Sequence, residues 1–460
     1  MVLRKTLVWT FLVAMVLTLI SGALMAAAKQ TVIVIGNWPR ENDPVRQAFY
    51  EEKSKIMLEK YNVKVIGDTW QYSVASFFPK AAAGKLPTVY NTWFTEPGKI
   101  VDAGYAADAT AAMKKLGWYA ALDPQIRGIL SKNGKIYAVP IFAYVLGLQI
   151  NVGIFRKAGL LDANGVPIAP KTYEELANTS KIIRDKTGTA GFGLCTSSNC
   201  GGWHFQSIAW SFGAEFEKKV NGKWKAVFNS PEAVAALQYV KDLKWKYNAL
   251  PETALIDWAK GQELIGTDQV AMKFNDGTSH GGFNFIINNY KVSKDNIALA
   301  SMPAGPKGRY ALMGGDCYMF DPMAKAAQIE AGLRFIELIA GGPKVDATSL
   351  KSMEELYKTD VSGNFVVGAQ SFPLWINPDR IKAENTIWAK YVNVNLDFFK
   401  DYNNYSQVKV RAEEPVNCQD LYANLDGVIQ SVLTDKNADP KALLDKAVAA
   451  FQKDFLDKAD

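Results

Sequence analysis

The sequence has little histidine and cysteine, and this scarcity limits the chemistry that the chain can perform. Only two histidines, His204 and His280, and four cysteines occur among its 460 residues. It contains neither an H-E-x-x-H zinc motif nor a G-x-x-x-x-G-K-[ST] phosphate loop. Cys195, Cys200 and His204 fit no common zinc spacing. We therefore expect no metal site and no cofactor.

One hydrolase-like pattern is present, but it is incomplete. Residues 277–281 read Gly-Thr-Ser-His-Gly, which matches the G-x-S-x-G nucleophile elbow. That fold needs a catalytic histidine after the elbow, and no histidine follows His280. A carboxylate pair for glycoside cleavage is recognised by its separation, which a sequence does not give. Asp276 and Asp316 are the pair to watch, and we predict that the chain is not an enzyme.

Clustered charge is also lacking. The formal net charge is +6, yet no run of basic residues resembles a nucleic-acid footprint. The composition, 48% hydrophobic and 21% charged, is that of a folded soluble protein. The length corresponds to two large or three small domains. We expect a monomer without a nucleic-acid partner.

The N-terminus is the one long apolar run, and it has the layout of a secretory signal peptide. Arg4 and Lys5 precede an apolar stretch over residues 7–20, and residues 26–28 are all alanine. The apolar stretch is short for a membrane span of about 20 residues, which favours cleavage over an uncleaved anchor. This region has no cysteine that could carry a lipid anchor. We predict that residues 1–28 are removed and that the mature chain is free in the periplasm.

Export permits disulfide bonds among the four cysteines. Cys195 and Cys200 flank a short polar turn, so they form either a local bridge or a pair of packed free thiols. The sequence does not tell whether Cys317 and Cys418 pair.

Strand and helix signals alternate at the start of the mature chain, which predicts an α/β fold. Residues 31–36 form an apolar run that ends in glycine, typical of a buried parallel strand. Asp43 and Pro44 have the form of a helix start. Further strands are predicted at residues 63–66 and 88–91, and later helix starts at Thr172 and Ser230.

Tryptophans follow the first three predicted strands. Trp38, Trp70 and Trp93 lie in loops after the carboxyl ends of these strands, where open parallel sheets form their ligand crevice. We predict that these rings line a ligand site. The alternative is that they cap the edge of the sheet.

Several segments resemble, in the right order, the family 1 extracellular solute-binding proteins, to which the maltose-binding protein belongs. They are residues 104–110, 134–140, 148–151, 155–160, 170–176, 266–272 and 302–306. The chain departs from the family pattern at Thr88, at residues 149–151 and in the Lys-Phe-Asn-Asp-Gly that follows Met272. The last departure falls at the family's ligand position, so the ligand is not transferred from any relative.

The resemblance implies the type II, Venus-flytrap fold of two α/β lobes joined by hinge strands. Carried onto this chain, the first lobe comprises residues 29–142 and 299–321, and the second comprises residues 143–298 and 322–460. The chain is expected to cross between the lobes near residues 141–144, 297–301 and 319–322. The ligand would lie between the lobes.

The resemblance also implies the substrate-binding component of an ABC importer, which docks on a membrane permease after closing on its ligand. A sugar is bound by aromatic rings on its apolar faces and by Asp, Asn or Gln on its hydroxyl edges. Trp210 and Trp375 are predicted either to contact the ligand or to pack in a core. Asn37 and Asp316 are predicted either to contact the ligand or to form turns. Asp316 also follows two glycines, where the backbone can approach a ligand closely. The predicted contact residues are Asn37, Trp38, Trp70, Trp93, Tyr144, Trp203, Trp210, Asp276, Asp316 and Trp375.

Other functions fit the same sequence features. The fold could bind a polyamine, a polyol, a phosphate ester or a metal complex instead of a sugar. The acidic and aromatic loops favour a neutral or cationic ligand, because a phosphate is usually met by Arg or a helix N-terminus. An exported carbohydrate-active enzyme and a partner of a membrane sensor are the remaining alternatives.

Overall fold

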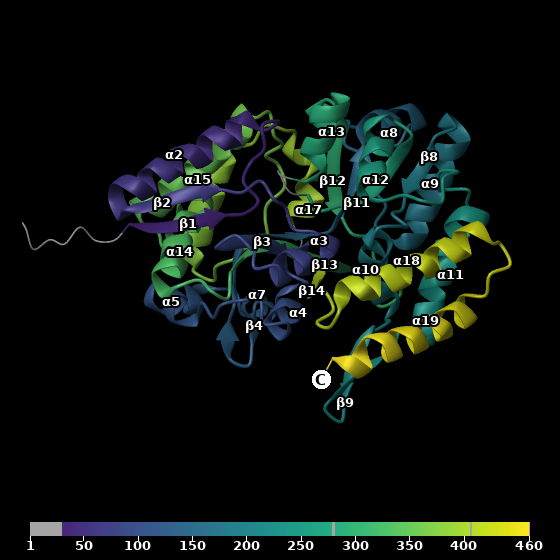
Figure 1. Ribbon diagram of the computed structural model, residues 1–460. Helices are drawn as coiled ribbons and strands as arrows, with labels where there is room; N and C mark the ends of the chain where they lie inside the picture. Colours follow the sequence, from purple (N-terminus) through teal and green to yellow (C-terminus); the bar gives the residue numbers. More distant parts are fainter. Residues whose placement is uncertain (1–29, 278–280, 405–406, 460) are drawn as a thin grey trace, which may run out of the picture.

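The computed structural model describes residues 30–277, 281–404 and 407–459, which form two α/β lobes (Figure 1). The expected signal peptide and the Thr278–His280 part of the hydrolase-like pattern lie outside the described residues. Within the described ranges, no helix is long and apolar enough to cross a membrane.

A mixed sheet forms the centre of the first lobe, with the strand order β14-β13-β3-β1-β2 and with β6 also paired to β13. β1 runs parallel to β2 and β3, as the sequence predicted, whereas β13 runs antiparallel to β3 and β6. The strands are β1 (Thr31–Ile35), β2 (Val63–Gly67), β3 (Val89–Trp93), β6 (Ala138–Val145), β13 (Tyr310–Phe320) and β14 (Lys409–Ala412).

Helices cover this sheet and close the first core. The predicted helix start at Asp43 is confirmed, because its carboxylate accepts a hydrogen bond from the Arg46 amide at 3.1 Å and Pro44 opens the first turn. A short β-ladder, β4 (Ser131–Lys132) with β5 (Lys135–Ile136), lies at the rim. The helices on this side are α2 (Pro44–Tyr61), α3 (Val74–Ala82), α4 (Pro97–Asp102), α5 (Thr110–Lys115), α6 (Trp118–Ala121), α7 (Pro124–Ile129), α14 (Ala326–Ala340), α15 (Ala347–Ser362) and α16 (Pro378–Tyr391).

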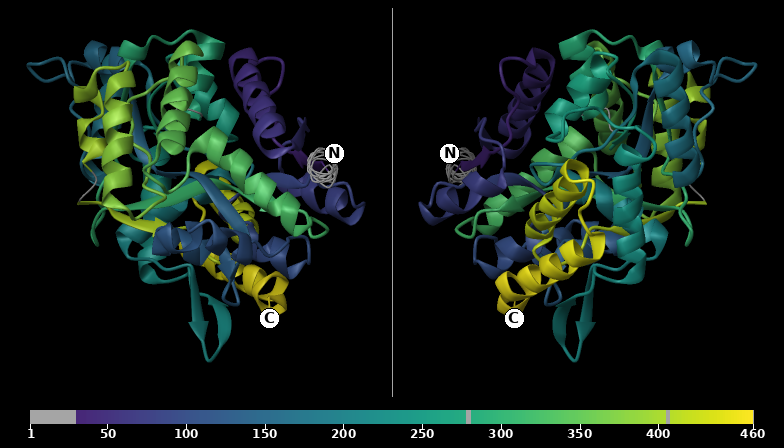
Figure 2. Two further views of the ribbon diagram at one scale, coloured as in Figure 1. Left: turned by 90° about the vertical axis from the view of Figure 1, so that its left-hand side faces the viewer. Right: turned by 90° about the vertical axis from the view of Figure 1, so that its right-hand side faces the viewer.

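The second lobe has its own sheet, in the order β12-β7-β11-β8, and its own core. A hairpin of β9 (Glu217–Val220) and β10 (Lys223–Ala226) projects from it (Figure 2). The strands are β7 (Gly147–Asn151), β8 (Ala190–Gly193), β11 (Val270–Asn275) and β12 (Ile297–Ser301). The helices are α8 (Val152–Ala158), α9 (Tyr173–Thr187), α10 (Cys200–Phe212), α11 (Pro231–Trp245), α12 (Trp258–Gly266), α13 (Gly282–Tyr290), α17 (Lys400–Asn403), α18 (Cys418–Thr434) and α19 (Pro440–Asp454).

Short connections join the two sheets. β6 passes directly into β7 through Leu146, and Tyr402 covers this crossing by donating a hydrogen bond to the Val145 carbonyl at 2.7 Å. β12 returns the chain to β13 of the first sheet. Residues 413–417 then lead from β14 of the first sheet to α18 of the second lobe.

The expected lobe boundaries differ from the packing in three places. The expected first lobe ended at residue 142, but β6 of the first sheet runs to Val145. The expected second segment of the first lobe began at residue 299, but β12 belongs to the sheet of the second lobe. The expected second lobe included everything after residue 321, yet α14 places Leu333 and Ile336 in the first core. α14 packs against α2 and β1 because its apolar stripe covers the first sheet before the chain crosses over.

Candidate functional site

Aromatic and acidic side chains from both lobes meet where the two sheets face each other. Tyr144 comes from β6, Trp203 from α10, Asp276 from the end of β11, Asp316 from β13 and Glu413 from the segment after β14. Tyr144 is close enough to Glu413, Asp276 and Asp316 to feel their charges. Every one of these side chains keeps partial contact with solvent. They therefore form one partly exposed cluster between the lobes.

Tyr144 lies across the strand that faces it. It is paired with Gly314, and a Cβ at that glycine would lie 2.3 Å from the Tyr144 hydroxyl oxygen. At the next position a Cβ on Gly315 would lie 2.7 Å from the Phe94 ring. The two glycines thus accommodate neighbouring aromatic side chains, which corrects the expectation that they admit a ligand to the backbone.

The Tyr144 hydroxyl is a hydrogen-bond donor at neutral pH. Burial and the charges of Glu413, Asp276 and Asp316 raise its pKa well above the usual range. Its ring meets that of Trp203 edge to face, with centroids 6.2 Å apart and an interplanar angle of 85°. The pair offers a ligand both a ring face and a polar group.

Asp316 is held on the sheet directly opposite Trp93 of β3 and Phe142 of β6. Directly paired residues of an antiparallel ladder lie on the same face of the sheet, so Trp93 is a neighbour of this carboxyl group. Burial raises the pKa of Asp316 to about 7, and the charge of Asp276 acts in the same direction against a hydrogen bond from Asn91. A modest change in surroundings therefore decides whether Asp316 is charged at neutral pH.

Glu413 was not predicted from the sequence. Burial raises its pKa to about 8, with Glu96 and Asp316 adding to the effect. The Tyr422 hydroxyl lies 2.8 Å from Glu413 Oε1 and 2.9 Å from Gln206 Oε1. The sequence Glu413-Glu414-Pro415 carries no pattern that would place the Glu413 carboxyl group in a binding site. Its position depends on the crossing of residues 413–417 between the lobes.

Glu96 and Tyr72 extend the site within the first lobe and were likewise not predicted. The Tyr72 hydroxyl donates a hydrogen bond to Glu96 Oε2 at 2.5 Å. Burial raises the pKa of Glu96, while the Tyr72 hydrogen bond and Lys99 lower it. Trp93, which is 36% exposed, meets the Tyr72 ring edge to face with centroids 5.0 Å apart.

Polar contacts bridge the lobes beside this cluster. Gln419 Nε2, at the start of α18, donates to Thr95 Oγ1 of the first lobe at 3.2 Å. Lys99 Nζ lies 2.7 Å from Asp420 Oδ2. These contacts hold the lobes together in the arrangement that the structure describes.

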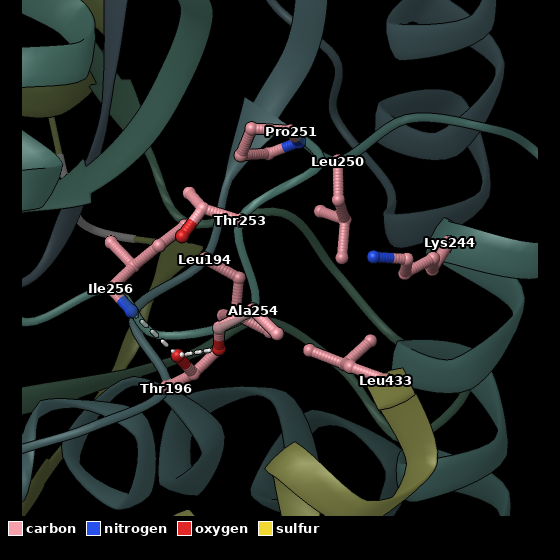
Figure 3. Close-up of a pocket in the computed structure, with 9 residues that line it drawn as sticks. All are labelled: Leu194, Thr196, Lys244, Leu250, Pro251, Thr253, Ala254, Ile256 and Leu433. Carbon is pink, nitrogen blue, oxygen red and sulfur yellow. Dashed lines mark hydrogen bonds between the residues drawn. The ribbon is translucent and has the colours of Figure 1, made fainter. Parts of the chain in front are cut away.

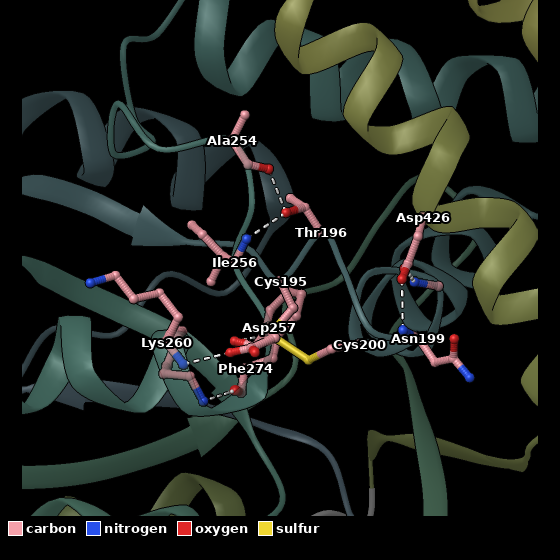
Figure 4. Close-up of a disulfide and its surroundings, with 12 residues drawn as sticks. Cys195, Thr196, Asn199, Cys200, Ala254, Ile256, Asp257, Lys260, Phe274 and Asp426 are labelled. Atoms are coloured by element: carbon pink, nitrogen blue, oxygen red, sulfur yellow. Dashed lines mark hydrogen bonds between the residues drawn. A yellow bond between two sulfur atoms is a disulfide. The ribbon is translucent and has the colours of Figure 1, made fainter. Parts of the chain in front are cut away.

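A disulfide fixes the start of the helix that carries Trp203 (Figure 4). Cys195 and Cys200 are bonded, which decides between the two alternatives left by the sequence, and Cys317 and Cys418 are free and buried. Asp426 of α18 accepts hydrogen bonds from the backbone amides of Asn199 at 2.7 Å and Gly202 at 2.9 Å. α10 is therefore anchored both covalently and through α18.

His204 lies behind the site and not in it. Its ligand atoms and those of Cys195 and Cys200 are within 4.8 Å of one another, but both sulfurs are used in the disulfide. The ring packs against Trp203 and Phe274. Burial lowers its pKa well below the usual value, so the ring is neutral.

The ligand-contact prediction is wrong for Trp38, Trp210 and Trp375. Trp38 stacks on Phe335 of α14, with an interplanar angle of 18° and centroids 6.1 Å apart, inside the first core. Trp375 packs edge to face on Trp118 in the same core, and Trp210 is 1% exposed in the second core. Large rings close the ends of these cores, which was the alternative considered for Trp210 and Trp375.

Asn37 and Trp70 lie at the edge of the first sheet. Asn37 has a left-handed backbone with φ of 56°, and its amide donates to the Trp70 carbonyl at 2.9 Å. This is the turn-forming role that was the alternative for Asn37. The Trp70 ring is partly exposed, with Lys80 Nζ 5.0 Å from its centre. The structure thus brings Tyr144, Trp203, Asp276 and Asp316 together, with Trp93 beside Asp316.

A small, mostly apolar recess lies beside Thr196 in the second lobe (Figure 3). Thr196 crosses its floor, donating to the Ala254 carbonyl at 2.6 Å and accepting from the Ile256 amide at 2.9 Å. Its other walls include Leu194, Leu250 and Leu433. Because the Thr196 hydroxyl is already used, this recess offers little to a polar ligand.

The chain was compared with known proteins. The sequence model for the bacterial extracellular solute-binding proteins matches residues 38–341. The melibiose/raffinose/stachyose-binding protein MelE of Bacillus subtilis (strain 168) is 25% identical over 301 residues, which cover 61% of this chain and 65% of that protein. The match thus spans slightly less than two thirds of that relative.

Solved structures resemble the whole fold. The GacH receptor of Streptomyces glaucescens, described unliganded and with acarbose, matches with a TM-score of 0.68 at 19% identity over 93% of this chain and 99% of that one. A solute-binding protein of Thermotoga lettingae bound to α-D-tagatose also has a TM-score of 0.68, at 17% identity over 92% of this chain and 99% of that one. These matches confirm the predicted two-lobe type II fold.

Proposed function

The chain belongs to the bacterial extracellular solute-binding proteins, and from this premise we propose that it is the substrate-binding component of an ABC importer for a sugar or an oligosaccharide. It acts outside the cytoplasm as a monomer without a lipid anchor, after removal of residues 1–28. It binds its ligand and returns it chemically unchanged.

The convergence of Tyr144, Trp203 and Asp316 between the lobes carries this proposal. Ring faces suit the apolar C–H surfaces of a sugar, and the hydroxyl and carboxyl groups suit its polar edges. The groups come from both lobes, so a ligand contacts all of them only when the lobes are closed. The names of MelE and of the sugar-bound neighbours support a carbohydrate ligand.

Closure follows from differential affinity. A ligand that contacts both lobes stabilises the closed form relative to the open one by the contacts that only closure provides. The short connections at Leu146 and at residues 413–417 are where backbone rotation would let the lobes separate. The closed, loaded form then docks on the membrane permease.

A binding screen tests the proposal. The chain from residue 29 onward is titrated with mono- and oligosaccharides and polyols, while intrinsic tryptophan fluorescence and the melting temperature are followed. A ligand that binds only the native state raises the melting temperature by mass action. At a hundredfold excess over Kd, it raises the free energy of unfolding by about 2.7 kcal/mol. A saturable response supports the proposal, and no response to any carbohydrate overturns the ligand assignment.

The fate of the ligand separates a binding protein from an enzyme. Mass spectrometry of the recovered ligand should show an unchanged mass after prolonged incubation. A shortened oligosaccharide would contradict the non-enzymatic role and would make Asp276 and Asp316 the first residues to replace. Ligand-dependent stimulation of ATP hydrolysis by the cognate permease in proteoliposomes tests the importer role separately.

A further inference from the structure

We propose that the saccharide recognised between the lobes carries a protonated amine, so that the ligand is an amino sugar or an oligomer that contains one. This inference rests on the proposed function and narrows its ligand class. It follows from the charges of the cluster between the lobes.

Carboxyl groups from separate elements lie within electrostatic range of one another. Asp316 is within electrostatic range of Asp276, and Glu413 is within range of both Asp316 and Glu96. The first lobe supplies Glu96 and Asp316, and the second supplies Asp276. Glu413 comes from the connection that follows β14. The acidic character is therefore assembled only when the lobes and this connection come together.

Among the described residues, each basic side chain near these acids has a bonded partner other than Asp316 or Glu413. Lys99 Nζ bonds Asp420, and Lys273 Nζ donates to the Phe274 carbonyl at 2.8 Å. Arg411 pairs with Glu215 at 2.8 Å. The charge of Lys99 lowers the pKa of Glu96, and the charge of Asp276 raises the pKa of Lys273. The charges that act on Asp316 and Glu413 are those of other acids. Asp316 and Glu413 are thus the groups that a positive ligand would complement.

The remaining groups of the site suit the same ligand. Tyr144, Trp203, Tyr72 and Trp93 place aromatic rings beside the carboxyl groups, and ring faces attract cations. Gln206 is fully buried, its oxygen contacts the Tyr422 hydroxyl next to Glu413, and its Nε2 has no partner among the described residues. This buried amide lies behind the contact between Tyr422 and Glu413.

The pH dependence of affinity distinguishes a cation from a neutral sugar. Burial raises the pKa of Asp316 to about 7 and that of Glu413 to about 8, so near neutral pH in the empty site Asp316 is about half protonated and Glu413 is mostly protonated. A cationic ligand binds best when they are ionised, so it displaces their protons and its affinity rises with pH, up to about tenfold per pH unit for each proton released. A neutral sugar that accepts hydrogen bonds from the protonated acids weakens over the same range.

Glu413 lies outside residues 38–341, the part that matches the family. Its place beside Asp316 depends on the connection between β14 and α18. Tyr422, which bonds it, lies in the same region.

The experiment uses matched pairs of ligands. Glucose and glucosamine, galactose and galactosamine, and cello-, chito- and chitosan oligosaccharides are titrated by calorimetry between about pH 5.5 and pH 7.5. Spermidine is included as an amine without a sugar. We expect the amine-bearing member of a pair to bind at least tenfold more tightly, with affinity that rises with pH.

Variants test whether the acids cause the preference. Asp316→Asn and Glu413→Gln should each reduce the preference for the amine at least fivefold while binding of the neutral partner persists. Glu414→Gln is the matched control, because Glu414 is also a buried acid of raised pKa but faces Trp210 and Arg411. This control should leave the preference unchanged.

The outcomes separate the two proposals. Equal or tighter binding of a neutral sugar overturns the amine inference and leaves the sugar-importer function intact. Binding of spermidine with no response to any saccharide overturns the saccharide assignment in both. Amine preference that survives in both acid variants overturns the assignment to Asp316 and Glu413.

Discussion

Lys99 and Asp420 form an ion pair that joins the two lobes. Lys99 is on α4 of the first lobe and Asp420 is in the first turn of α18, and their side-chain nitrogen and oxygen are 2.7 Å apart. Both side chains remain partly exposed, at 30% and 23%. The pair lies next to the Gln419–Thr95 hydrogen bond, so the contacts between the lobes are polar at this rim and reversible.

Replacing Lys99 with methionine should shift the chain toward an open form. A partly exposed pair contributes about 0.2–1 kcal/mol, so the ratio of closed to open molecules should fall up to about fivefold. Small-angle scattering of the ligand-free chain should show a larger radius of gyration, and affinity for the ligand should fall by the same factor. Lys115→Met is the control, because Lys115 pairs with Glu330 inside the first lobe. An unchanged radius of gyration would contradict the role of the Lys99–Asp420 ion pair in holding the lobes closed.

Substitution by alanine should have opposite effects on stability at Gly202 and at Gly427. Both lie inside helices, but a Cβ on Gly202 of α10 would lie 2.4 Å from the Tyr422 Cα, whereas nothing lies within 4 Å of one on Gly427 of α18. Gly427→Ala should stabilise by about 1 kcal/mol through helix propensity. Gly202→Ala should destabilise by about 1–3 kcal/mol or more, because two helix backbones must separate. Urea unfolding of both variants checks the pair, and a stable Gly202→Ala would contradict the close packing of α10 on α18.

The Cys195–Cys200 bond should contribute to the stability of the second lobe. Closing so short a loop is worth about 2 kcal/mol in the chain-entropy account. The Cys195→Ser, Cys200→Ser double variant should therefore melt about 4–8 °C lower in this lobe. Reducing agent should lower the melting temperature of the parent chain by the same amount and leave the variant unchanged. An effect of reducing agent on the variant would indicate another redox-sensitive group.

The fold was largely predictable because its signals are local. Apolar runs ending in glycine gave β1 and β2, and the capping residue Thr172 accepts from the Glu175 amide at 3.1 Å, as a helix cap does. The path after β13 was not predictable. α14 is apolar along one stripe, and nothing in that stripe specifies which of two sheets it covers.

The site was predictable only in part, because it is made by pairs that are distant in the sequence. Tyr144 and Asp316 were named from the sequence, since one was expected at the hinge and the other follows a glycine pair, and the structure places them close together. Trp38 was misassigned because a tryptophan after a strand can face either the crevice or a covering helix, and here α14 stacks on it. Glu413 depends on a late crossing that no local pattern marks.

Stability should fall with rising pH because of a buried acid away from the site. Burial raises the pKa of Glu217 to about 9, with Glu414 adding to the effect. The folded-state pKa thus lies above the unfolded value, so the stabilisation by this group is complete below about pH 4 and is lost as pH rises toward 9. Glu217→Gln carries no charge, so at pH 9 its free energy of unfolding should exceed that of the parent by more than about 1 kcal/mol. At pH 4 it should have no such advantage. Urea unfolding at both values tests this, and parallel pH profiles would contradict it.

Two tryptophans should separate ligand binding from stability. Trp203 is partly exposed beside Tyr144, so Trp203→Ala should weaken ligand binding about threefold to tenfold through the lost ring contact while the melting temperature changes little. Trp375 is 3% exposed and packs on Trp118, so Trp375→Ala should cost about 3–5 kcal/mol of stability while the folded molecules bind normally. Calorimetric titration and thermal melts of both variants give the two readouts. The Trp203 ring lies beside Tyr144, whereas the Trp375 ring fills a core. A loss of affinity in Trp375→Ala without a loss of stability would therefore show that the site extends to Trp375.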